Sequence, residues 1–497
     1  MTHSELVTSK IKTYLQELSP QAVRTLVRTL ERKRASGSAD PYVDLILAAS
    51  VDLLRTEILA EDEDFVPEDL KMNANGREMV PRLFFNPLEE FLINEKLPEK
   101  QEGRVHRPML SKVWNWISRD LLRNDIEKLI GEIEKGVLSE DRLDDMVRAL
   151  RRRSVEAMSA ALDRGSASEK EYRRLAMEMG GERGLADLRD INKIFAAETW
   201  LVPFLNAVPE SLSENRLKGD PDILNLVEKA AKRFPDYNSV VAAALLDRAD
   251  RPSALCSFAG RLARSEDPRV IGQSPYAPFV NMVMSEAERL NILAEAHRSN
   301  NPDPVAFSQA LQEYHTLVKG VERDMDLSQA GDWRLRLANT KKSISDIVSR
   351  ELSSAHAVVR RSLQVPGVDA TGRFEIDQDV INDAVRALRV VVMVGKASET
   401  FAVNDLGKRT RQAVEQTLEI LTRSLISELR KQHGRAMEAH MAAVDVAIML
   451  SEIYYGAEYA QQLRRSRHSA VAYAKEHAKA SPMPGLSKPK VKELAAG

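Results

Sequence analysis

The stretch from Lys408 to Lys475 constrains the fold most, because its apolar residues recur at steps of three and four positions. This spacing places side chains on one face of an α-helix and is typical of helices that pack against other helices. The stretch contains no proline, and its only glycines are Gly434 and Gly456. We therefore predict one long helix with a coiled-coil-like seam, or two nearly collinear helices with a break near His433–Gly434. The apolar positions behind this prediction are Val414, Leu418, Leu421, Leu425, Met437, Met441, Val444 and Ile448.

The composition extends the helical prediction to the whole chain. Only 5% of the 497 residues are aromatic, and the 22 glycines fall below the average share of about 7%. Strands favour aromatic and β-branched residues, and the turns between strands need glycine. The predicted fold class is therefore all-α, with multi-helix bundles that have long C-terminal helices and a middle region of shorter helical hairpins.

Breaks in the helical pattern divide the chain into six predicted segments. Six acidic residues flank Phe65, Val66 and Pro67 between Glu61 and Asp69, which is typical of a solvated linker. Prolines at positions 221, 252, 268 and 302 divide the middle of the chain into short helices. The segments are an N-terminal helical segment (1–60), an acidic, proline-rich connector with an apolar patch (61–107), a helical region (108–210), a short-helix hairpin region (211–330), a long-helix bundle (331–480) and a disordered basic tail (481–497).

The charge balance and the apolar runs indicate the compartment. The chain has 72 basic and 74 acidic residues, a net charge of −2, so it is not a general polyanion binder and nucleic acid is not an expected partner. Cys256 is the only cysteine, which excludes an intramolecular disulfide. The N-terminus lacks the apolar core of a secretory signal, and no apolar run approaches the roughly 20 residues that span a bilayer. We predict a cytoplasmic protein without a transmembrane segment.

Sequence motifs for cofactor or metal chemistry are incomplete. A phosphate-binding loop ending at Lys396 would need a glycine where Val390 stands and Ser or Thr where Ala397 stands. Histidines two positions after a glutamate, as in Glu295-x-His297, point away from that glutamate on a helix and cannot share a metal ion with it. We therefore predict no cofactor, no metal site and no catalytic residue.

Two groups of residues are candidates for binding a partner. Trp114 and Trp116 are two positions apart and so lie on opposite helix faces, which leaves Trp114 to meet another helix or a partner, with Arg119 nearby in sequence. Basic clusters on a helix and in the C-terminal tail could contact an anionic surface. The candidate partner-binding residues are Trp114, Arg119, Arg151, Arg152, Arg153, Lys488, Lys490 and Lys492.

The favoured functional hypothesis is a non-enzymatic scaffold, adaptor or regulatory protein that binds an unidentified protein partner through helix faces. A homodimer is expected if the seam past Lys408 exceeds what the rest of the chain can cover. One alternative is an enzyme with a non-local site in the helical middle region, with Gly180–Gly184, His297 and His315 as the residues to inspect. The other is binding of nucleic acid or an anionic surface through the basic tail.

Overall fold

A computed structural model describes residues 76–134, 139–299, 303–329, 331–369 and 373–480 of the chain. The predicted N-terminal helical segment (1–60) and basic tail (481–497), including Lys488, Lys490 and Lys492, lie outside these residues. Within them the all-α prediction is confirmed. The strands found there are β1 (Leu92–Ile93) and β2 (Val105–His106), which pair in parallel with Leu92 opposite Val105.

The chain forms two compact units. Among the described residues, the first unit contains those within 76–292 and 317–337, and the second contains those within 293–316 and 338–480. Three helices have residues in both units: α16 (Ala277–Ser299), α17 (Pro304–Asp324) and α18 (Gly331–Ser362).

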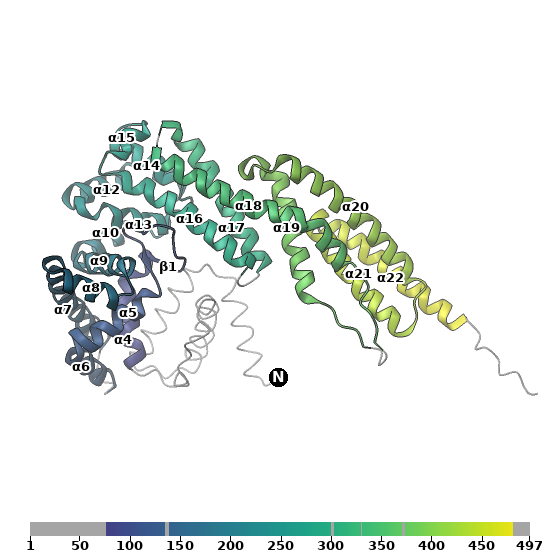
Figure 1. Ribbon diagram of the computed structural model, residues 1–497, viewed down its shortest axis with the longest axis horizontal. Helices are drawn as coiled ribbons and strands as arrows, with labels where there is room; N and C mark the ends of the chain where they lie inside the picture. The colour runs from purple at the N-terminus through teal and green to yellow at the C-terminus, as the bar shows by residue number, and fades with distance from the viewer. Residues whose placement is uncertain (1–75, 135–138, 300–302, 330, 370–372, 481–497) are drawn as a thin grey trace, which may run out of the picture. The chain divides into compact units, whose positions relative to one another are not determined.

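The helices of the first unit range from single turns to the 28 residues of Glu140–Ala167 (Figure 1). Its helices are α4 (Gly76–Phe85), η1 (Asn86–Phe91), α5 (Met109–Trp116), η2 (Ile117–Leu121), α6 (Arg123–Glu134), α7 (Glu140–Ala167), α8 (Glu169–Glu178), α9 (Glu182–Ala196), α10 (Glu198–Ala207), α11 (Glu214–Gly219), α12 (Pro221–Arg233), η3 (Pro235–Tyr237), α13 (Asn238–Arg248), α14 (Ala254–Ala263), α15 (Pro268–Gly272) and η4 (Leu327–Gln329).

Aspartate–proline pairs start two of these helices, as the sequence predicts. The Asp220 carboxylate accepts a hydrogen bond from the Asp222 backbone N–H at the start of α12. Asp267 caps Arg269 in the same way at the start of α15. The proline that follows each cap lies in the first turn of the helix. Backbone N–H groups there have no carbonyl acceptor within the helix, so the missing N–H of proline removes no hydrogen bond.

Helix α13 lies at the centre of the first unit. Its residues from Asn238 to Leu246 are all buried, and the stretch Val240–Leu246 contains only Val, Ala and Leu. A helix that is apolar on every side requires neighbours all round. The 3-10 turn η3, which leads into α13, is thereby fixed to the core at one end while it remains partly exposed.

The second unit ends in four helices: α19 (Gln378–Phe401), α20 (Asn404–Leu429), α21 (Gly434–Tyr455) and α22 (Ala457–Ala480). Helices α20, α21 and α22 pack against one another, and Figure 1 shows them side by side. The prediction of one long or two collinear helices past Lys408 is therefore wrong. The predicted break near His433–Gly434 is present, but α20 and α21 pack against each other there instead of lying collinear, and Gly456, with φ of +94°, adds a second break.

Candidate functional site

Three aromatic side chains form a partly exposed surface on the first unit, which we call the aromatic ledge: Trp200, Phe234 and Tyr237. Trp200 and Phe234 stack with their ring centroids 4.2 Å apart and their planes 11° from parallel. Tyr237 meets Trp200 edge-on, at 5.4 Å and 86°. All three rings are only half-buried, so their apolar surface and their polar edges are available to another molecule.

The local sequence explains why these rings lie together. Helix α12 ends at Arg233, and Phe234 adopts a non-helical backbone before Pro235 starts η3. This short turn places Phe234 and Tyr237 beside the first turn of α10, which carries Trp200. Below them, Phe204 is buried, with its ring 6.5 Å from that of Trp200.

Cations and unsatisfied donors accompany the rings. The Arg233 guanidinium lies 5.3 Å from the centre of Phe234, and the Lys193 ammonium lies 5.4 Å from the centre of Tyr237. Neither the indole N–H of Trp200 nor the hydroxyl of Tyr237 has a hydrogen-bond partner among the described residues. The aromatic ledge therefore offers apolar area, positive charge and two hydrogen-bond donors.

A buried charge network lies next to the aromatic ledge. The segment Asn94–Arg107, which we call the clasp segment, joins β1 to α5 and includes β2. Its Lys100 ammonium lies 2.9 Å from Asp187 and 2.6 Å from Asp190, both buried on α9. Burial raises the pKa of Asp190, against the opposing effect of Lys100. At the surface, Glu102 pairs with Lys193 at 2.6 Å, so the clasp segment also reaches the ledge.

The other side of the clasp segment binds α16. Arg104 donates to the carboxylate of Glu286 at 2.9 Å and to the hydroxyl of Ser285 at 3.1 Å. Arg289 also binds Glu286, at 2.8 Å, and reaches Glu95 of the clasp segment at 3.0 Å. Burial alone would raise the pKa of Glu286, but the charges of Arg289 and Arg104 outweigh it and lower that pKa to about 2.

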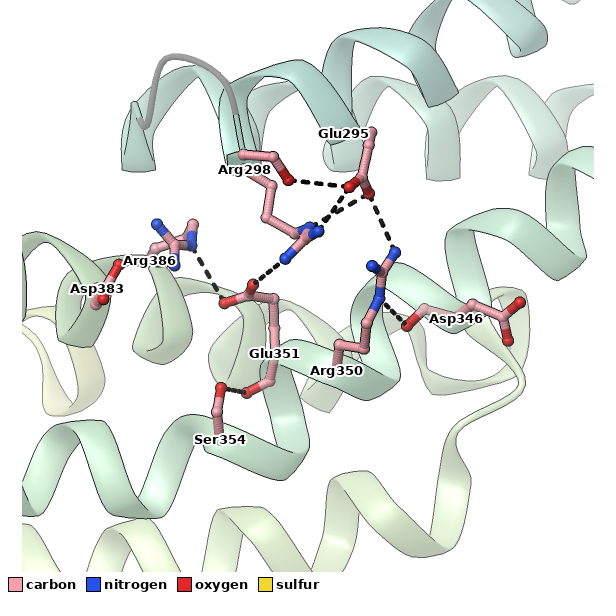
Figure 2. A network of polar contacts seen from close by, with 9 residues as sticks. Glu295, Arg298, Asp346, Arg350, Glu351, Ser354, Asp383 and Arg386 are labelled. Atoms are coloured by element: carbon pink, nitrogen blue, oxygen red, sulfur yellow. Dashed lines mark hydrogen bonds and ion pairs between the residues drawn. The ribbon is translucent and has the colours of Figure 1, made fainter.

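The second unit contains its own buried network, centred on Glu351 of α18 (Figure 2). Arg386 of α19 donates to Glu351 at 3.2 Å, and Arg298 of α16 lies 3.9 Å from its other oxygen. Glu351 is only 4% exposed. Arg298 and Arg350 then share Glu295, at 2.6 and 3.1 Å. The guanidinium N–H groups donate hydrogen bonds to the carboxylates, and the opposite charges compensate each other. These contacts join α16, α18 and α19.

Of the residues named for the enzyme alternative, Gly180–Gly184 belong to the first unit, and His297 and His315 belong to the second. Gly180 and Gly181, both with positive φ, form the turn between α8 and α9 in the first unit. His315 of the second unit lies 2.8 Å from the Thr400 hydroxyl, and the Nδ1 atom of His297 is buried with no hydrogen-bond partner among the described residues. The described ranges contain no group of three or more His, Cys, Asp or Glu side chains placed to hold a metal ion.

The predicted partner-binding residues do not form one surface. Trp114 packs its ring 5.3 Å from Phe84 and 6.0 Å from Phe85 in an internal aromatic cluster. Arg119 is exposed and pairs with Asp120 and Glu178. These contacts are within the protein and leave the prediction of a partner at Trp114 and Arg119 untested.

The arginine cluster on α7 divides by exposure. Arg151 is buried and binds Glu198 through two hydrogen bonds of 2.9 and 2.6 Å, which places it beside the start of α10. Arg152 is exposed, and Arg153 is exposed and pairs with Asp125. Of these three, Arg151 alone contacts an element of the aromatic ledge, and it supports that element from inside.

Comparison with known proteins adds no functional information. No protein-family model, no curated protein and no solved structure matches this chain. In the described part of the chain, none of the helices combines the length and the apolar character needed to cross a bilayer. The class of protein that the fold defines is an all-α protein of two helical units.

Proposed function

We propose that this protein is a non-enzymatic helical scaffold or adaptor that binds a protein partner through the aromatic ledge. The observation that carries the proposal is the half-buried stack of Trp200 on Phe234, with Tyr237 and Arg233 beside it. Trp, Tyr and Arg are the residue types most enriched among interface residues that dominate binding energy. On the sequence grounds given above, we place this role in the cytoplasm.

The rigidity of the support favours this proposal. Phe204 is buried beneath Trp200, and the carboxylate of Glu198, two residues earlier, is bound by the buried Arg151. An aromatic surface that is already ordered loses little conformational entropy when a partner binds. The ledge is thus built as a preorganised surface rather than as a mobile one.

The buried charged groups support a structural role for the polar residues. Lys100, Arg104 and Arg289 contact carboxylates of the first unit, which also carries the aromatic ledge. Their hydrogen bonds and ion pairs join helices to one another, which is the requirement for holding a binding surface in place.

A matched pair of variants tests the proposal. We expect Trp200→Ala to abolish recovery of the partner by crosslinking and affinity purification, while Met177→Ala retains it. Met177 is 81% exposed on α8 of the same unit and makes a suitable control. Recovery of the same partner by wild type and Trp200→Ala in equal amounts would contradict the proposal.

Independent measurements address the alternatives. A metabolite that raises the melting temperature equally in wild type and Trp200→Ala would support an enzyme with a site elsewhere. Salt-sensitive retention on heparin that is lost on deleting residues 464–497 would support the anionic-surface alternative. Light scattering that gives a dimer, lost in Trp200→Ala, would identify the partner as a second copy of the chain.

A further inference from the structure

We propose that the acidic segment Glu61–Leu70 of this same chain docks on the aromatic ledge, with Phe65 against the rings. The segment would then compete with any partner for that surface and act as an autoinhibitory element. The inference goes beyond the proposed function, because an internal segment can occupy the ledge whether or not a partner exists.

Charge complementarity is the first argument. The segment carries six carboxylates and no basic residue. On α12, Lys229 and Arg233 are one turn apart, and neither has an ion pair among the described residues. Asp236 is exposed beside them, and the nearby Glu102 and Glu228 are each paired with a lysine. Arg233, which lies against Phe234, and Lys229, one turn before it on α12, therefore favour an acidic occupant.

The chemistry of the rings is the second argument. The edges of aromatic rings are electropositive, and the Trp200 indole N–H and the Tyr237 hydroxyl are available as donors. Carboxylates accept such hydrogen bonds but cannot donate when ionised. The segment places Phe65 directly after four carboxylates, so it combines an aromatic anchor with acceptors on one short stretch.

Reach is the third argument. Arg151 binds both the Leu83 carbonyl on α4 and the Glu198 carboxylate on α10, so α4 passes close to the ledge. From Leu83 back to Gly76, where α4 begins, the helix rises by about 10 Å. The eleven residues from Phe65 to Gly76 span up to about 38 Å when extended. This length is sufficient for the segment to reach Trp200 in whichever direction α4 runs.

Site-specific photocrosslinking in the purified full-length protein tests the proposal. Pro203 is exposed and lies one turn after Trp200, on the same side of α10. We expect Pro203→p-benzoylphenylalanine to crosslink to the tryptic peptide Thr56–Lys71, as identified by mass spectrometry. The same photocrosslinker at Met177 is the control and is expected to give no such product.

Two further variants separate specific docking from chance contact. Phe65→Ala, and neutralisation of residues 61–64 to the corresponding amides, should each lower the crosslink yield several-fold, because they remove the anchor and the charge. Absence of the product, or a yield unchanged in both variants, would overturn the proposal.

Isotope labelling distinguishes the source of the segment. In an equal mixture of ¹⁴N and ¹⁵N protein, docking within one chain gives only products of uniform label. Mixed-label products would show that a second copy supplies the segment, and this would also overturn the proposal. Loss of partner recovery in Trp200→Ala is a separate readout, so failure of the docking proposal and failure of the proposed function can be told apart.

Discussion

Glu351 and Glu286 are carboxylates that the fold removes from water and surrounds with arginines. Taking a charge out of water costs several kcal/mol, and the ion pair repays this only when the geometry is good. Both residues meet that condition, with Arg386 at 3.2 Å from Glu351 and Arg104 at 2.9 Å from Glu286. Removing one partner of such a pair leaves the other charge buried and uncompensated.

We therefore predict that Glu351→Gln destabilises the second unit by about 3–5 kcal/mol. Glu295→Gln is the matched control: its side chain is 41% exposed, so its loss should cost about 1 kcal/mol or less. Hydrogen exchange of the α18 and α19 amides measures the effect in the unit concerned. Equal loss of protection in both variants would contradict the assignment of Glu351 as the centre of the network.

A second prediction at the residue scale concerns acid. The pKa of Glu286 is lowered from 4.5 to about 2 in the folded protein, so its contribution to stability is present above pH 4.5 and is lost as the pH falls towards 2. A shift of this size corresponds to stabilisation on the order of 3 kcal/mol. The free energy of unfolding of the wild type should fall steeply over that pH range. The free energy of unfolding of Glu286→Gln should fall less. Parallel pH profiles for the two proteins would disprove this role of Glu286.

Features that depend on neighbouring residues could be predicted from the sequence. Ion pairs between residues far apart in the sequence could not. The Asp220 cap and the buried thiol of Cys256, whose pKa burial raises, both follow from their sequence neighbours. Arg104 and Glu286 are 182 positions apart. No spacing rule connects such residues, because only the packing of α16 against the clasp segment brings them together.

At the scale of elements, the clasp segment shows how a stretch with little regular structure is held. Leu97 and Val105 are buried, while Lys100 and Arg104 bind α9 and α16. Gly103 has φ of +86°, and a Cβ there would lie 2.6 Å from the Ser239 carbonyl. The segment therefore depends on the ion pairs of Lys100 and Arg104 with buried carboxylates, and on one glycine that cannot be replaced without strain.

Lys100→Met should loosen this element strongly. It leaves Asp187 and Asp190 buried without their cation, which we expect to cost about 3–5 kcal/mol in the first unit. Because burial would then hold the pKa of Asp190 above its value in the unfolded chain, the variant should regain stability as the pH falls from 7 towards 5. Amide exchange of α9 at both pH values measures this. Lys96→Met, at an exposed position of the same segment, is the control and should behave as wild type.

The error about the helix past Lys408 shows a limit of periodicity. Val414, Leu418, Val444 and Ile448 are buried as the three-and-four spacing predicts. The same spacing arises whether one long helix packs along a neighbour or three shorter helices pack on each other, since each buries one face. The chain turns back at 430–433 and again at Gly456, and a single glycine within a helical pattern is a weak signal of such a turn.

The aromatic ledge depends on the packing of the whole first unit, because its residues lie on α10, at the end of α12 and on η3. Pro235 and the arginine before Phe234 mark a turn in the sequence, but nothing there indicates that Trp200 will lie against it. The all-α class was predictable from composition because it depends on average propensities. The ledge was not, because it depends on how α10 packs beside a turn more than thirty residues away.

The affinity for an isolated partner tests the central claim most directly. Burying a tryptophan at the centre of an interface commonly contributes about 2 kcal/mol or more, which is about thirtyfold in Kd. We predict that Trp200→Ala weakens binding by at least about that factor, while Met177→Ala and wild type bind equally and all three proteins have the same helical circular dichroism. A Kd unchanged by Trp200→Ala would contradict the assignment of the aromatic ledge as the partner surface.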